Sequence, residues 1–268
     1  MENYVDQNPA SQIFESQSTK SKFYTQIFLY FGLGILLTAI SSLLLGFIFS
    51  SIWPMSTIID GVIYLNQETI GIYTGILVVS MIALLIVSFV ISFKSLRGSG
   101  SILVPYIVYS VLLGVVLSAL AFFIGDTYII GEALFITALL FLGMCGIGYV
   151  THNKLATWAK ITIGLSIALI LLCLLNLIFI PFVFFGGNYS AFFDGYIWTY
   201  LIVEGVVFLL FLVLTAFDMA RIRTIAERGY GSKNIALYCA LSLYTDFINL
   251  FIQVLRILLT IAASSRRN

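Results

Sequence analysis

The sequence contains very few charged residues. Only 9% of its 268 residues are Asp, Glu, Lys or Arg, whereas 61% are hydrophobic. A soluble globular domain carries about 25% charged residues, so a soluble core with a charged shell is excluded. The net charge of +1 gives no indication of nucleic-acid binding. We therefore expect a protein whose main partner is the lipid bilayer and not a nucleic acid.

Residues that build disulfide frameworks and metal clusters are also scarce. The chain has three cysteines and one histidine. An odd number of cysteines, all within or at the edge of apolar runs, argues against disulfides or a cysteine metal cluster. We interpret Cys145, Cys173 and Cys239 as small packing residues, and we expect no resident cofactor.

The sequence is instead rich in long runs without any charged residue. They cover Phe23–Ile59, Thr69–Phe93, Gly98–Gly125, Ala133–Thr151 and Ile161–Phe193, and two further apolar spans with some charge cover 196–221 and 234–262. Each is close to or longer than the ~20 residues that a helix needs to cross a bilayer. Membrane-spanning strands would instead need alternating segments of ~10 residues. We predict an all-α polytopic protein with seven transmembrane helices in residues 21–265, after a disordered polar tail of residues 1–20.

The basic residues lie in alternate connections between the spans. They are Lys20, Lys22, Lys94, Arg97, Lys154, Lys160, Arg221, Arg223, Arg228 and Lys233, whereas the other connections hold only Asp60, Glu68, Asp126, Glu132 and Asp194. The positive-inside rule then places the N-terminus in the cytoplasm. Arg256, Arg266 and Arg267 are exceptions, so the seventh span either crosses or folds back. We favour crossing, because no Gly or Pro follows Gly231.

Two aspartates interrupt the last two apolar spans. Asp218 and Asp246 lie in segments that are otherwise almost free of charge. A carboxylate at membrane depth costs about 2.5–3.5 kcal/mol on insertion scales, so such residues usually mark function. Ser232, in the turn between the spans, is midway between them in the sequence. An antiparallel hairpin therefore brings them to a similar depth, and into one site if the helix faces match.

Such a pair has a specific chemistry. Two carboxylates in contact in a low dielectric do not both ionise easily, so they share a proton and titrate together. When both are ionised, the pair attracts a cation such as Ca²⁺, which prefers carboxylate oxygens. Asp218 and Asp246 are thus our candidates for proton sensing and for Ca²⁺ ligation. The alternative is that each aspartate only caps or hydrogen-bonds a neighbouring helix.

Other charges are candidate partners of this pair. Arg221 follows Asp218 by three residues and shares its helix face, while Lys94 and Arg97 lie at the inner end of the second span. A basic residue held against the ionised pair would close a path through it.

Two further charges lie inside the apolar spans. Arg256 is ten residues beyond Asp246, about 15 Å along a helix, which is too far for direct pairing. It either extends toward the interface or meets Glu204 of the sixth span.

Three segments resemble the Bax inhibitor-1 family, also called the transmembrane Bax inhibitor motif family. The strongest match is Ala-Leu-Ser-Leu-Tyr-Thr-Asp-Phe-Ile-Asn-Leu-Phe at 240–251, followed by Leu255-Arg256. The others are Phe217-Asp218 with Arg221-Ile222, and the weaker 146–158 region. The family usually has Tyr-Asp-Thr-Gln-Arg-Ile where this chain has Phe-Asp-Met-Ala-Arg-Ile at 217–222, and Leu is commoner at the position of Thr245. The chain therefore lacks the Tyr hydroxyl and the Gln amide that would hydrogen-bond around Asp218.

The resemblance implies a fold and a function. It implies a central seventh helix surrounded by six others, and a pH-sensitive calcium leak in which a di-aspartyl unit senses protons. Asp218 and Asp246 match that unit, and Lys94 or Arg97 would be a basic latch. Bacterial members lie in the cell membrane and some bind membrane proteases. Animal and plant members are tied to cell-death suppression and organelle calcium, with the endoplasmic reticulum as the alternative location. The short, simple chain favours a bacterial member.

The sequence lacks residues that several other membrane-protein functions require. An intramembrane aspartyl protease has Gly-x-Gly-Asp and a later Pro-Ala-Leu, but no Pro follows Pro181 here. A retinal protein needs a lysine in its last span, and none follows Lys233. A serine-type intramembrane protease needs a buried histidine, and His152 falls in a predicted loop. We therefore expect no enzyme. A non-conducting scaffold or modulator of membrane proteases and the stress response stays open.

Overall fold

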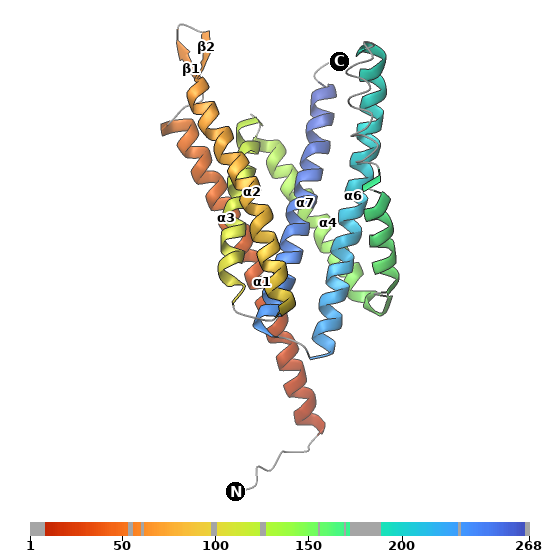
Figure 1. Ribbon diagram of the computed structural model, residues 1–268. Helices are drawn as coiled ribbons and strands as arrows, with labels where there is room; N and C mark the ends of the chain where they lie inside the picture. Colours follow the sequence, from red (N-terminus) through yellow and green to blue (C-terminus); the bar gives the residue numbers. More distant parts are fainter. Residues whose placement is uncertain are drawn as a thin grey trace. The chain divides into compact units, whose positions relative to one another are not determined.

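The computed structural model is predominantly helical (Figure 1). It describes residues 9–52, 56–59, 62–97, 101–123, 127–154, 156–168, 170–171, 189–229 and 232–265. The helices are α1 (Pro9–Phe47), α2 (Gln67–Arg97), α3 (Leu103–Phe123), α4 (Thr127–Val150), α6 (Tyr189–Glu227) and α7 (Lys233–Ser265). Residues 156–168 are also helical. A π-helical turn at Ile48–Ile52, a 3-10 turn at His152–Lys154 and the strands β1 (Ser56–Ile59) and β2 (Val62–Leu65) complete the described elements.

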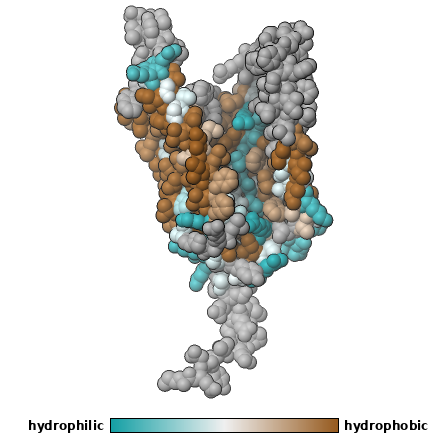
Figure 2. All heavy atoms as spheres, viewed as in Figure 1, coloured by the Kyte–Doolittle hydropathy of each residue, from teal (hydrophilic) through white to brown (hydrophobic). Residues whose placement is uncertain are grey.

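Five described helical segments are long and apolar enough to cross a membrane. They are Thr19–Phe47, Gln67–Lys94, Tyr128–Val150, Val203–Glu227 and Lys233–Ala262, and α3 adds the shorter apolar stretch Leu103–Ala119. Apolar side chains cover much of the described surface (Figure 2). The prediction of a helical multi-pass membrane protein is therefore confirmed. The predicted fifth span, Ile161–Phe193, lies partly outside the described residues.

The first helix includes part of the polar N-terminal segment. α1 starts at Pro9, whereas the sequence favoured a disordered tail for residues 1–20, and that division of the chain stays a prediction. Proline is well suited to the first position of a helix, because its missing N–H has no intrahelical partner there. No glycine or second proline interrupts the chain before Gly32. The polar segment therefore continues directly into the apolar one as a single helix.

The end of the first apolar run forms a hairpin instead of a helix. Strands β1 and β2 pair antiparallel, with Ser56 opposite Leu65 and Ile59 opposite Val62. Pro54 precedes β1 in the sequence, and a proline has no N–H for a helical hydrogen bond. The Ile-Ile pair at 58–59 favours a strand. The two residues between the strands are Asp-Gly, the dipeptide typical of a two-residue hairpin turn. This signal was present in the sequence and was missed.

Helix α7 is one continuous helix from Lys233 to Ser265. Its 33 residues span about 50 Å, more than the ~30 Å of the hydrocarbon. A continuous helix of this length contradicts a fold-back and supports crossing. α7 also buries a larger share of its residues than the other described spans. A central position surrounded by six helices stays a prediction.

The chain divides into two compact units. The first comprises residues 1–126 and 226–244, and the second comprises 127–225 and 245–268. In the first unit, α1 packs extensively on α3, and α3 also packs on α2. Ile91, Ile102 and Leu237 form a buried cluster there.

Hydroxyl groups link three helices inside the first unit. The Tyr106 hydroxyl donates to the Tyr30 carbonyl at 2.6 Å. The Thr38 hydroxyl hydrogen-bonds the Tyr244 hydroxyl and also lies 3.0 Å from the Ser110 carbonyl oxygen. These bonds satisfy polar groups that would otherwise be buried without partners at a cost of about 1–3 kcal/mol each. They join α1, α3 and the N-terminal part of α7.

Gly34 is required by this packing. A methyl group at this position would collide with the Tyr106 hydroxyl, whereas Gly32 has open space around the corresponding position. We expect Gly34→Ala to displace that hydroxyl from the Tyr30 carbonyl and to destabilise the protein by about 1 kcal/mol. Thermal unfolding of the detergent-solubilised protein measures the loss. Gly32→Ala is the control, and equal melting temperatures for the two variants would contradict this account.

Candidate functional site

The two intramembrane aspartates lie together in the second unit. Asp218 is on α6 and Asp246 is on α7, and the two residues are 7% and 5% exposed. The Asp246 carboxyl group has the Asp218 side chain as a hydrogen-bond partner. The structure thus brings together the residues that the sequence singled out.

A hydrogen bond between two carboxyl groups needs one proton. A carboxylate only accepts hydrogen bonds, so one of the two groups must carry an O–H that donates to the other. The second oxygen of Asp246, Oδ2, is buried and has no hydrogen-bond partner in the described part of the chain. Two buried carboxyl groups that interact in this way are suited to share one proton, and Asp246 Oδ2 stays available as an acceptor.

Helix α4 forms a third wall of this site. The rings of Phe141 on α4 and Phe247 on α7 meet edge to face, with centroids 5.4 Å apart. A methyl group on Gly148 of α4 would collide with the Ala216 backbone of α6. Cys145 lies between these two contacts on the same face of α4, four residues after the first and three before the second.

The Cys145 thiol is buried and interacts electrostatically with both aspartates. Sequence reasoning treated Cys145 as a packing residue and missed this position. The spacing Phe141, Cys145, Gly148 was the available signal, because residues at such intervals share one helix face.

A second pair of charges joins α6 and α7. The Arg256 guanidinium donates to Glu204 Oε1 at 2.9 Å. The Glu204 side chain is 10% exposed and that of Arg256 is 52% exposed, so the carboxylate is buried and the guanidinium reaches outward. Of the two alternatives for Arg256, pairing with Glu204 is the one that the structure forms.

The three basic residues predicted to pair with the aspartates do not all lie in the same unit. Arg221 lies on α6 of the second unit and is half-buried. Lys94 and Arg97 belong to the first unit, and the side chain of Arg97 is outside the described residues. The latch role of these two residues stays a prediction.

Arg223 on α6 contacts the C-terminal end of α4. Its guanidinium donates to the Tyr149 carbonyl at 2.6 Å and lies 4.2 Å from the centroid of the Tyr149 ring. This combines a charge-assisted hydrogen bond with a cation–π contact. The contact lies one residue after Gly148, so it helps to hold α4, which carries Cys145, against α6.

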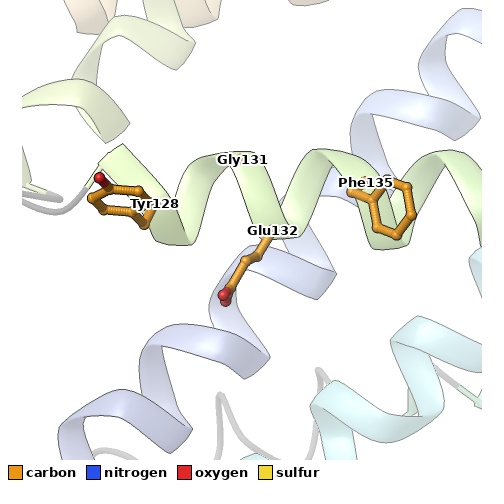
Figure 3. A pocket seen from close by; sticks show the side chains of 4 residues that line it. All are labelled: Tyr128, Gly131, Glu132 and Phe135. Atoms are coloured by element: carbon orange, nitrogen blue, oxygen red, sulfur yellow. The ribbon is translucent and has the colours of Figure 1, made fainter.

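An open cavity lies at the opposite end of α4 (Figure 3). It measures about 610 Å³ and is lined by Tyr128, Gly131, Glu132 and Phe135. Glu132 is exposed and lies thirteen residues, or about 20 Å along the helix, from Cys145. Its carboxylate therefore belongs to a different environment from that of the buried pair.

Comparisons with known proteins extend these observations. The family described as Inhibitor of apoptosis-promoting Bax1 matches residues 20–264. An uncharacterized membrane protein of Streptococcus pyogenes serotype M1 is 27% identical over 239 residues, covering 88% of this chain and 92% of that protein. The inner membrane protein YbhL of Escherichia coli K12 is 29% identical over 186 residues, covering 68% and 72%. Because the family match spans nearly the whole chain, the protein belongs to the Bax inhibitor-1 family that its sequence resembles.

Proposed function

We propose that this protein is a pH-sensitive cation leak pathway, with Ca²⁺ as the main permeant ion and Asp218 and Asp246 as its proton sensor. The observation that carries the proposal is the contact between these two buried carboxyl groups on α6 and α7. A structural role alone does not explain two such groups, since a neutral side chain would avoid the cost of burial. Two carboxyl groups respond to pH, whereas two neutral side chains at these positions would not.

Electrostatics gives the direction of the pH effect. With a shared proton, the pair carries one negative charge and attracts a divalent cation weakly. With both groups ionised, it carries two charges and provides up to four oxygens for Ca²⁺. We therefore expect cation flux to rise as pH rises and the shared proton is lost.

The pair suits a passing ion better than a stored one. Among the described residues, no group of three or more His, Cys, Asp or Glu side chains could hold a metal ion. Ca²⁺ takes 6–8 oxygen ligands, so an ion at the pair would keep much of its water. Weak binding of this kind lets an ion enter and leave, as conduction requires.

The names of two relatives support a cellular location for this protein. One is named as an inner membrane protein of Escherichia coli, and another is a membrane protein of Streptococcus pyogenes. We propose that this chain lies in a bacterial cell membrane with its N-terminus in the cytoplasm, as the distribution of Lys and Arg favours.

Calcium flux into proteoliposomes across pH 5–8 tests the function. We expect the parent protein to conduct more Ca²⁺ at pH 8 than at pH 5. Asp218→Asn and Asp246→Asn are expected to flatten this profile, because each removes one of the two coupled carboxyl groups. Glu132→Gln is the matched control, since it neutralises an exposed carboxylate on α4 and should leave the profile unchanged.

Three outcomes would contradict the proposal. Absence of flux through the folded parent protein would favour the non-conducting scaffold instead. The same pH profile in the parent and both Asp variants would show that the pair is not the sensor. A flux that falls with rising pH would reverse the predicted sign and favour closure of the ionised pair by a basic latch.

A further inference from the structure

Polar residues follow one face of α7 beyond the aspartate pair. Asp246, Asn249, Gln253, Arg256 and Thr260 recur at intervals of three and four residues, the spacing of a single helix face. A face of this kind in a membrane helix needs polar surroundings.

Three buried oxygens around this face have no hydrogen-bond partner in the described part of the chain. They are Asp246 Oδ2, Gln253 Oε1 and Glu204 Oε2. The residues that carry them are 5%, 6% and 8% exposed, respectively. Leaving such a group unpaired costs about 1–3 kcal/mol, and more for a charged one, so a native protein normally supplies a partner.

Water is the partner that fits their spacing. Gln253 lies seven residues beyond Asp246 on nearly the same face, about 10 Å along the helix, too far for the two side chains to satisfy each other. Arg256 is one turn further on, and its bond to Glu204 Oε1 fixes that carboxylate while leaving Oε2 available. All three oxygens are acceptors, so each needs a donor such as water.

We propose that Gln253 and Glu204 line a hydrated path along α7, leading from the end of the helix that carries Arg256 to Asp246. This inference deepens the proposed function, because it names the route by which water and cations reach the proton sensor. Oxygen acceptors along the route replace part of the hydration of a cation. Gln253 is then the neutral polar group between the two carboxylates of the path.

Cysteine labelling tests the path without any measurement of flux. In a variant with Cys145, Cys173 and Cys239 replaced by serine, a single cysteine is introduced as Gln253→Cys or as Val254→Cys. Val254 is the matched control, because it is 5% exposed and Gln253 is 6% exposed, at almost the same depth. Only a thiol in contact with water ionises and reacts with a small cationic methanethiosulfonate, so we expect Gln253→Cys to react at least about tenfold faster. Equal rates would overturn the path.

Flux measurements then test the role of Gln253 in the path. Gln253→Leu keeps the size of the side chain and removes its oxygen, and we expect it to lower Ca²⁺ flux severalfold. Gln253→Asn keeps the amide and should retain most of the flux, while Val254→Leu should match the parent. Parental flux in Gln253→Leu would overturn this role. Absence of flux in the parent, with the labelling difference intact, would contradict only the proposed function.

Discussion

Replacing Gly148 with valine is expected to destabilise the protein by about 2–3 kcal/mol, the upper part of the range for an overpacked core. A Cβ at this position would collide with the carbonyl oxygen, carbonyl carbon and Cα of Ala216. These are backbone atoms, so no side-chain rotation relieves the collision. Helices α4 and α6 would have to separate two residues from Asp218.

The control for this prediction lies on the same helix. Gly143 has no neighbouring heavy atom near its corresponding Cβ position, so Gly143→Val should unfold at nearly the parental temperature. Thermal unfolding in detergent, followed by the loss of helical circular dichroism, compares the two variants. If both unfold together, the close contact between α4 and α6 does not exist in the protein.

Removal of the Arg256 charge is expected to cost about 2 kcal/mol, between the values for exposed and buried ion pairs. Arg256→Leu leaves the buried Glu204 carboxylate without its cation, and the half-exposed position of Arg256 reduces the cost. We expect the loss to be smaller when Glu204→Gln is added, because a neutral amide is less costly to bury than an unpaired carboxylate.

The double variant makes this prediction specific to the ion pair. Unfolding temperatures of the parent, the two single variants and the double variant form a thermodynamic cycle that isolates the coupling between the residues. A double variant less stable than Arg256→Leu alone would show that the guanidinium acts through packing and not through its charge.

Hydropathy was sufficient to predict the spans that the structure describes, because uncharged runs of this length have few alternatives in a protein. The aspartate pair was predictable for the same reason, since a carboxylate is conspicuous in such a run. The hairpin at 56–65 was not predicted, because its strands continue an apolar run and hydropathy does not distinguish an apolar strand from an apolar helix. Turn chemistry, the Asp-Gly at 60–61, carried the missing information.

Neutral residues of the site were harder to identify. In a membrane helix, the faces toward lipid and toward protein are both apolar, so the pattern does not reveal which glycine or cysteine meets another helix. Gly143, Gly146 and Gly148 looked equivalent in the sequence, yet only Gly148 would collide with a neighbour if it carried a Cβ. The positions of Cys145 and Gln253 likewise depend on tertiary packing.

The continuity of α7 has a mechanical consequence. Tyr244 belongs to the hydroxyl network of the first unit, and Asp246, two residues later, belongs to the carboxyl pair of the second. A helix is stiff along its axis because every turn is bonded to the next. Any axial shift of Asp246 on gain or loss of a proton therefore moves Tyr244 by the same amount.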